Sequence, residues 1–115
     1  MNATIYHNPR CSKSRQTLQL LEDKGCEVEI IEYLKNPPEP DTIKQLLELL
    51  SLAPRELMRK KESAYKEQQL NDESLSEQTL IEAMYKNPIL IERPIVVANN
   101  KAAIGRPPEA VLKIL

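Results

Sequence analysis

The first third of the chain has an apolar pattern that changes from strand to helix and back to strand. Thr4–His7 and Val28–Tyr33 have the short alternating pattern of β-strands, and residues 14–24 between them have helical spacing that ends at Gly25. The apolar positions expected on the buried side are Leu18, Leu21, Val28 and Ile30. A strand, a helix and a strand in this order predict a parallel pair joined by a right-handed crossover.

The middle of the chain, from about 41 to 87, is predicted to be helical and follows a proline-rich break. Asp41 is expected to cap a first helix, Pro54 to open a short second one, and Ser74 or Ser76 to cap a third. In the third helix the positions expected to face inward are Leu80, Ile81, Met84 and Tyr85. This segment separates the first two strands from the strands that follow it.

The last part of the chain returns to a strand pattern. Ile95–Ala98 has the composition of a buried strand, residues 99–101 form a turn, and Ala102–Ile104 is expected to pair back in antiparallel fashion. A final helix begins at residues 107–108. The pattern therefore predicts one α/β domain over residues 1–115. Its fold would be a thioredoxin-like mixed four-stranded sheet, with a helical insertion between the βαβ unit and the C-terminal β-hairpin.

Composition narrows the class of protein. Of the 115 residues 41% are hydrophobic but none is Trp or Phe, so the core has to be built from Leu, Ile and Val. Sixteen basic and 17 acidic residues give a net charge of −1, which favours neither a nucleic-acid nor a membrane surface. No apolar run approaches the ~20 residues that span a bilayer, and the N-terminus has no signal-peptide pattern. Two cysteines in such a chain predict a cytoplasmic protein with reduced thiols.

Cys11 lies between the first predicted strand and the first predicted helix, in the run His7–Arg15. The first N–H groups of a helix carry partial positive charge, so a thiolate there is stabilised, its pKa falls, and anions bind nearby. Arg10, Lys13 and Arg15 add positive charge. These neighbours are not typical of a buried core cysteine, and the run predicts a reactive thiol beside an oxyanion site.

Two polar residues are expected to modify the reactivity of this thiol. His7 precedes Cys11 by four residues across a tight turn and can donate a hydrogen bond or a proton. Ser14 lies in the first turn of the predicted helix, where it could donate a hydrogen bond to the thiolate.

Further arginines are candidates for completing the anion site. Arg93 and Arg106 each precede a proline, which holds the backbone extended and gives the side chain a stiff base. The residues alone leave open whether these two side chains bind an anion or are simply solvated. Arg59 lies in a basic run, where a solvated helix face is the plainer interpretation.

Several other sites are excluded by the sequence. A redox Cys-x-x-Cys would need a second cysteine where Ser14 stands, and a phosphotyrosine-phosphatase loop would need an arginine where Thr17 stands. One His and two Cys are too few for zinc, and two glycines are too few for a phosphate-binding loop. No metal and no bound cofactor are therefore expected. Cys26, which follows a helix-ending glycine, is interpreted as structural.

The chain resembles the arsenate reductase (ArsC) family, and in particular its glutaredoxin-coupled branch. Four stretches carry the resemblance, in order along nearly the whole chain: His7-x-x-x-Cys11-x-x-x-Arg15, Leu57-Met58-Arg59-Lys60, residues 87–97 and residues 105–112. The resemblance implies a thioredoxin-like fold in which Pro94 is a cis-proline beside the active site.

The same resemblance assigns roles to individual side chains. Cys11 would be the nucleophile, and His7 and Ser14 would lower its pKa. The side chains implied to bind the substrate are Arg15, Arg59, Arg93 and Arg106.

The implied reaction is the reduction of arsenate to arsenite by a cytoplasmic, monomeric enzyme. The Cys11 thiolate attacks arsenic, glutathione then attacks the adduct and reduces it, and glutaredoxin resolves the glutathionylated cysteine. Glutathione is thus a co-substrate rather than a bound cofactor. One protein cysteine is enough for this scheme, which agrees with Ser14 in place of a second cysteine.

The active-site loop also departs from the family pattern. Arsenate reductases of this family carry Gly directly after the cysteine, followed by Thr, whereas this chain has Ser12 and Lys13. Three alternatives therefore stay open. One is a reductase of a related oxyanion, and a second is a glutathione-linked thiol oxidoreductase with another substrate. The third is a non-catalytic transcription regulator of the same fold, although such proteins typically carry a Cys-x-x-Cys pair, and Ser14 stands where its second cysteine would be.

Overall fold

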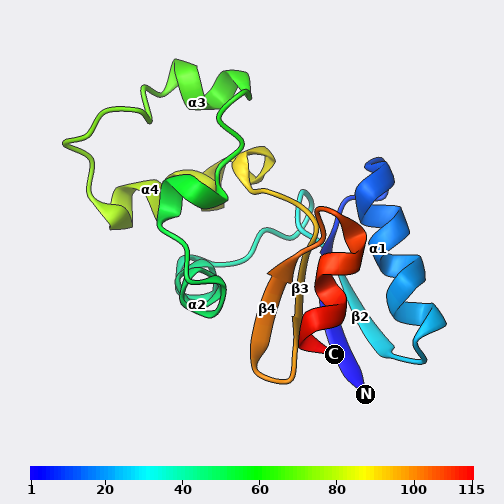
Figure 1. Ribbon diagram of the computed structural model, residues 1–115. Coiled ribbons are helices and arrows are strands. Elements are labelled where there is room, and N and C mark those ends of the chain that lie inside the picture. The colour runs from blue at the N-terminus through cyan, green and yellow to red at the C-terminus, as the bar shows by residue number, and fades with distance from the viewer. The chain divides into compact units, whose positions relative to one another are not determined.

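The computed structural model describes residues 1–115, and the chain forms two compact units. The first consists of Met1–Asn36 and Arg93–Leu115, and the second is the intervening Pro37–Glu92. Figure 1 shows that all four strands belong to the first unit, whereas the second is built from helices and loops.

The first unit contains one mixed sheet in the order β2-β1-β3-β4. Its strands are β1 (Asn2–His7), β2 (Glu27–Glu32), β3 (Ile95–Ala98) and β4 (Lys101–Ile104). β1 pairs with β2 in parallel and with β3 in antiparallel fashion, and β3 pairs with β4 in antiparallel fashion. The predicted mixed four-stranded α/β fold is confirmed, because the late hairpin adds its strands next to β1.

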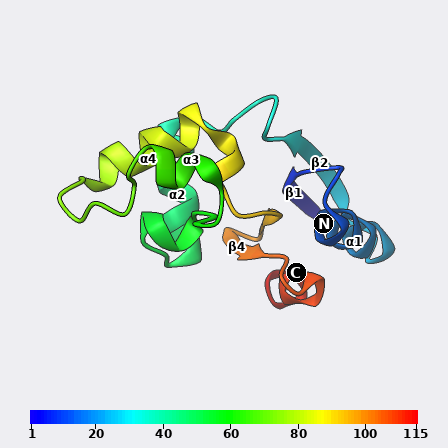
Figure 2. The ribbon, with the colours of Figure 1, turned by 90° about the horizontal axis from the view of Figure 1, so that it is seen from above.

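Two helical elements pack on one face of this sheet, as Figures 1 and 2 show. They are α1 (Ser12–Asp23) and the 3-10 helix η3 (Pro108–Ile114). The buried residues of this core are Ala3, Ile5, Leu21, Val96, Ala98, Val111 and Ile114. Small and branched aliphatic side chains fill the layer between sheet and helices, as expected for a chain without Trp or Phe.

The turn between β3 and β4 is tighter than predicted. It consists of Asn99 and Asn100 alone, with φ values of 54° and 60°, and Lys101 already pairs with Ala98. Two consecutive left-handed residues are typical of a two-residue hairpin turn, and Asn tolerates this conformation better than most residues. The predicted end of the first helix at Gly25 is confirmed, since Gly25 has φ 77° directly after the helix.

Two further details of the first unit differ from the predictions. α1 begins at Ser12, two residues earlier than expected, which makes Cys11 its N-cap residue. Ile30, expected to be buried, is 49% exposed. β2 is an edge strand that pairs only with β1, so the layer of helices covers it less fully than it covers the central strands.

The second unit is helical, as predicted for this stretch. Its elements are α2 (Pro40–Leu50), η1 (Pro54–Leu57), α3 (Ser63–Glu67), α4 (Glu77–Lys86) and η2 (Pro88–Leu90). α4 packs against α2, η1 and η2. No helix of the structure combines the length and the apolar character that crossing a membrane requires.

The helix boundaries here correct two predictions. Ser76 caps α4, and its hydroxyl accepts a hydrogen bond from the N–H of Thr79, so one of the two proposed caps is confirmed. Asp41 does not cap α2, because Pro40 takes the first helical position, which suits proline, and Glu39 precedes it. Asp41 lies in the first turn instead.

Tyr85 was expected to face inward, and this prediction is wrong, since the side chain is 38% exposed. Ala83 and Met84 fill the inward positions of the last turn of α4. The helix ends one residue after Tyr85, at Lys86.

Candidate active site

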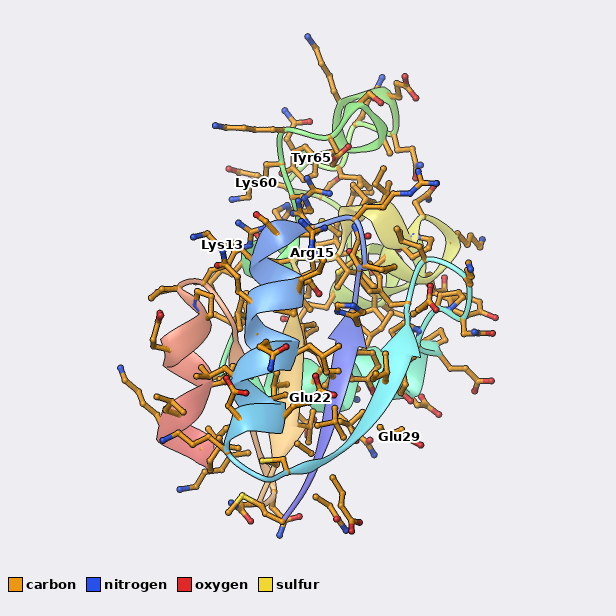
Figure 3. All side chains as sticks on the ribbon, turned by 90° about the vertical axis from the view of Figure 1, so that its right-hand side faces the viewer. Lys13, Arg15, Glu22, Glu29, Lys60 and Tyr65 are labelled. Carbon is orange, nitrogen blue, oxygen red and sulfur yellow. The ribbon has the colours of Figure 1, made fainter.

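Cys11 is the N-cap residue of α1, with an extended backbone at φ −94° and ψ 123°. The first turn of α1 contains no acidic residue, although acidic side chains there would stabilise the helix dipole. It carries Lys13 and Arg15 instead, which project from the N-terminal end of α1 in Figure 3. The residues at this end of the helix therefore favour the binding of an anion at some cost in helix stability.

The pKa of the Cys11 thiol is lowered from its ordinary value of 9.0. Partial burial opposes ionisation, but hydrogen bonds from the main-chain N–H groups of Ser14 and Lys13 and the positive charges of Arg93 and Arg106 outweigh it. The predicted electropositive helix start therefore surrounds a thiol that ionises more readily than an ordinary cysteine. Thiolate is the nucleophilic form of cysteine.

Two arginines from the far end of the chain contribute positive charge at this thiol. A guanidinium nitrogen of Arg106 lies 3.6 Å from the sulfur of Cys11. The Nε of Arg106 donates to the carbonyl of Arg93 at 2.7 Å, which links the two residues. Both peptide bonds that follow these arginines, at Pro94 and Pro107, are cis, so the isomer implied for Pro94 is found.

His7, Ser14 and Asn8 form a buried hydrogen-bond network behind the thiol. The Nδ1 of His7 lies 2.6 Å from the hydroxyl of Ser14, and that hydroxyl also accepts the N–H of Asn8 at 3.0 Å. His7 and Ser14 are 6% and 0% exposed. The Ser14 hydroxyl thus bonds to His7 and Asn8, and it is the main-chain N–H of Ser14 that reaches Cys11.

Burial also lowers the pKa of His7 from its ordinary value of 6.5. The carboxylate of Glu32 works against this shift, and the charge of Arg15 adds to it. The imidazole is therefore neutral at neutral pH. A neutral ring can accept the proton of the Ser14 hydroxyl, which fixes the orientation of the loop that precedes Cys11.

Arg15 and Arg59 were both predicted to bind the substrate, and their surroundings differ. A guanidinium nitrogen of Arg15 donates to the carbonyl of Pro9 at 2.9 Å, which braces the loop before Cys11. Arg59 belongs to the second unit, where its guanidinium lies 2.9 Å from the carboxylate of Glu62. Substrate binding by Arg15 and Arg59 stays a prediction.

The immediate surroundings of Arg59 are well defined within its own unit. Its N–H donates to the carbonyl of Leu90 at 2.7 Å, next to an isolated β-bridge between Met58 and Ile91. Its side chain lines a cavity of about 400 Å³ that Lys60 and Lys61 share with the carboxylates of Glu56, Glu62 and Glu92. The charge around this guanidinium is therefore mixed.

Two residues that support the site, Thr17 and Gly105, were not among the predicted site residues. The hydroxyl of Thr17, 0% exposed, donates to the carbonyl of Lys13 at 2.7 Å. A Cβ atom on Gly105 would lie 2.5 Å from the Thr17 hydroxyl oxygen and 2.8 Å from the ring of Pro94. Only glycine lets the chain that leads into Arg106 approach α1 so closely. The available signal was Gly105 itself, directly before an Arg-Pro unit in a chain with two glycines.

Comparison with known proteins now gives the family. The ArsC family model matches residues 6–114, and the chain belongs to the ArsC family. A protein of Escherichia coli K12, named only as uncharacterized protein YfgD, is 60% identical over 96% of this chain and 94% of its own length. The arsenate reductase of Neisseria meningitidis serogroup A is 46% identical over 96% of each chain.

Solved structures agree with the fold. The structure of arsenate reductase from Vibrio cholerae superposes with a TM-score of 0.97 at 52% identity, covering 100% of this chain and 98% of that one. The predicted thioredoxin-like fold and the ArsC resemblance are therefore confirmed.

Proposed function

We propose that this protein is an arsenate reductase that uses Cys11 as nucleophile and draws its electrons from glutathione and glutaredoxin in the cytoplasm. The observation that carries the proposal is a thiol of lowered pKa at a helix N-terminus, 3.6 Å from the guanidinium of Arg106. The names of relatives that cover nearly the whole chain support arsenate as the substrate.

The reaction needs two thiols for each arsenate. The Cys11 thiolate attacks arsenic and water leaves, which gives a cysteine-bound As(V) adduct. A glutathione thiolate then forms a disulfide with the Cys11 sulfur, and the electron pair of the S–As bond stays on arsenic, which leaves as arsenite. Glutaredoxin then exchanges with the Cys11–glutathione disulfide and restores the thiol.

Charge explains why the arginines would matter for this chemistry. A thiolate and an oxyanion repel each other, so the attack requires cations that offset the negative charge of the oxyanion and leave the thiolate free to react. The guanidinium of Arg106 lies 3.6 Å from the Cys11 sulfur, and the proposal assigns it, with Arg93 and Arg59, to the oxyanion. Guanidinium groups suit this role because their N–H groups match the oxygens of tetrahedral anions.

The experiment that tests this proposal measures NADPH consumption by the purified protein with arsenate, glutathione, glutaredoxin and glutathione reductase. We expect arsenate-dependent turnover that is lost in Cys11→Ser and retained in Cys26→Ser, the matched control for loss of a thiol. Turnover that persists in Cys11→Ser would overturn the assignment of the nucleophile.

A second outcome would identify another substrate. Ser12 and Lys13 distinguish the loop of this chain from the Gly-Thr expected after the cysteine, and Lys13 adds a cation beside the thiol. If arsenate gives no turnover while a glutathionylated peptide does, the protein is a glutathione-linked thiol oxidoreductase.

A further inference from the structure

A cavity of about 280 Å³ lies in the first unit, beside the loop that leads to Cys11. It forms where β1 and β2 end together, because His7 pairs with Glu32 in the register of the parallel strands. The chain segments that follow these two residues make its walls. The lining side chains that matter are His7, Pro9, Arg10, Glu32, Leu34 and Lys35.

The cavity does not suit the oxyanion. Its volume is several times the ~30 Å³ that a water molecule occupies in the liquid, far more than a tetrahedral anion needs. Its charge is also mixed, because the carboxylate of Glu32 faces it together with the cations of Arg10 and Lys35. A carboxylate repels an oxyanion but pairs with an ammonium group.

Mixed charge beside apolar surface matches a small peptide. Glu32 and Lys35 lie 3.6 Å apart as an exposed pair, and such pairs are weak enough for a ligand to separate. Leu34, an exposed apolar side chain, and Pro9 offer surface for aliphatic parts of a ligand. Arg10 lines the cavity and Cys11 is the next residue of the chain, which puts the cavity beside the segment that carries the thiol.

We propose that this cavity binds the thiol co-substrate, a peptide thiol with a free amino group and free carboxylates such as glutathione, with Glu32 facing the ammonium group and Arg10 and Lys35 the carboxylates. The inference rests on the proposed function, in which a peptide thiol must reach Cys11. It adds the place where that thiol is recognised, beside the loop that leads to Cys11 and next to His7, which also bonds to the Ser14 hydroxyl.

The test uses disulfide exchange, which needs no arsenate. In a Cys26→Ser background, the Cys11 thiolate attacks glutathione disulfide, forms the Cys11–glutathione disulfide and releases glutathione thiolate. The rate constant is measured by mass spectrometry and compared with that for hydroxyethyl disulfide, a neutral reagent without peptide groups. Glu32→Gln and Lys35→Gln are the test variants. Glu27→Gln, at the other end of β2, and Lys101→Gln, in β4, are the matched controls.

We expect each test variant to slow the reaction with glutathione disulfide about fivefold, the equivalent of ~1 kcal/mol, and to leave hydroxyethyl disulfide unaffected. Both controls should behave as the parent protein. Equal slowing with both disulfides would show that the variants change Cys11 itself and would overturn the inference. So would an unchanged rate with glutathione disulfide.

The contact assigned to Glu32 has its own test. Glutathione disulfide with acetylated amino groups should react more slowly than the unblocked reagent with the parent protein. In Glu32→Gln the two reagents should react equally fast, and a difference that persists there would refute the pairing with the ammonium group. None of these rates involves arsenate. The cavity proposal can therefore be refuted while arsenate turnover is observed, and it can be supported while arsenate turnover is absent.

Discussion

The guanidinium of Arg106 lies 3.6 Å from the sulfur of Cys11, and its charge is one of the causes of the lowered pKa. We expect Arg106→Ala to raise the pKa of Cys11 and to slow alkylation by neutral iodoacetamide at neutral pH about fivefold, a change that corresponds to less than one pH unit. The control is Lys113→Ala, which removes an exposed cation from η3. An unchanged alkylation rate would show that the two main-chain N–H groups and Arg93 stabilise the thiolate without Arg106.

Glu62 is a second residue whose role can be isolated. Its carboxylate lies 2.9 Å from the guanidinium of Arg59, and both side chains are 24% exposed. If Arg59 binds the oxyanion, the substrate has to displace this carboxylate. Glu62→Gln should then lower the KM for arsenate about threefold and leave kcat and the KM for glutathione unchanged, because half-buried pairs of this kind contribute up to about 1 kcal/mol.

Glu67→Gln removes the same charge from the end of α3 and is the control for this comparison. A raised KM for arsenate in Glu62→Gln would mean that Glu62 orients Arg59 for the substrate rather than competing with it. Loss of kcat alone would point to a structural role.

The contact between α1 and the end of β4 depends on the absence of a side chain at Gly105, since a Cβ there would lie 2.5 Å from the hydroxyl oxygen of Thr17. We expect Gly105→Ala to lower the free energy of unfolding by about 1–3 kcal/mol, as overpacking of a close contact does. It should also slow alkylation of Cys11, because the next residue is Arg106. Urea unfolding and iodoacetamide kinetics measure the two effects.

Gly25→Ala is the informative comparison. Gly25 has φ 77° and open space around it, so an alanine costs about 1 kcal/mol in backbone strain without a clash. The free energy of unfolding should fall in both variants, but the alkylation of Cys11 should be slower only in Gly105→Ala. Equal alkylation rates in the two variants would show that the packing of Gly105 does not affect the reactivity of Cys11.

The order of strands and helices was predictable because each depends on a local apolar period, as in β1, α1 and β3. Errors arose where an element meets an edge or an end. Ile30 is apolar in an alternating strand, yet it lies on an edge strand that no further strand covers. Tyr85 has the spacing of an inward position but lies in the last turn of α4. Period alone does not tell where the covering layer stops.

The residues of the candidate site also fall into those that the sequence predicted and those that it did not. Cys11 and its helix start were readable because the basic residues around it are neighbours in sequence. The contact between Arg106 and Cys11 joins positions 95 residues apart. The Arg-Pro unit made Arg106 a candidate for the anion site, but the residues alone left open whether it binds there, and the family resemblance supplied the assignment. The packing of Gly105 on Thr17 was missed, since neither residue carries a signal of the other.

Stability of the molecule should depend on pH through His7 and Cys11, whose folded-state pKa values are both lowered. The unfolded chain then binds more protons than the folded one, so the free energy of unfolding rises with pH. For His7 the rise lies between its lowered pKa and 6.5, and for Cys11 it lies between its lowered pKa and 9.0.

Urea unfolding at a series of pH values measures this dependence. Cys11→Ser should flatten the alkaline part of the curve, and Cys26→Ser, in which Cys11 remains, should retain it. A free energy of unfolding that falls as pH rises through this range in the parent protein would contradict the lowered pKa of Cys11.

The basic first turn of α1 has a practical consequence for anyone who wishes to make this protein more robust. Replacing Lys13 with an acidic residue is the standard way to strengthen such a helix start, and it would be expected to raise the melting temperature. The same replacement would bring a negative charge beside the thiolate and repel an incoming anion. A screen that selects for heat resistance alone would therefore enrich variants that fold better and react worse.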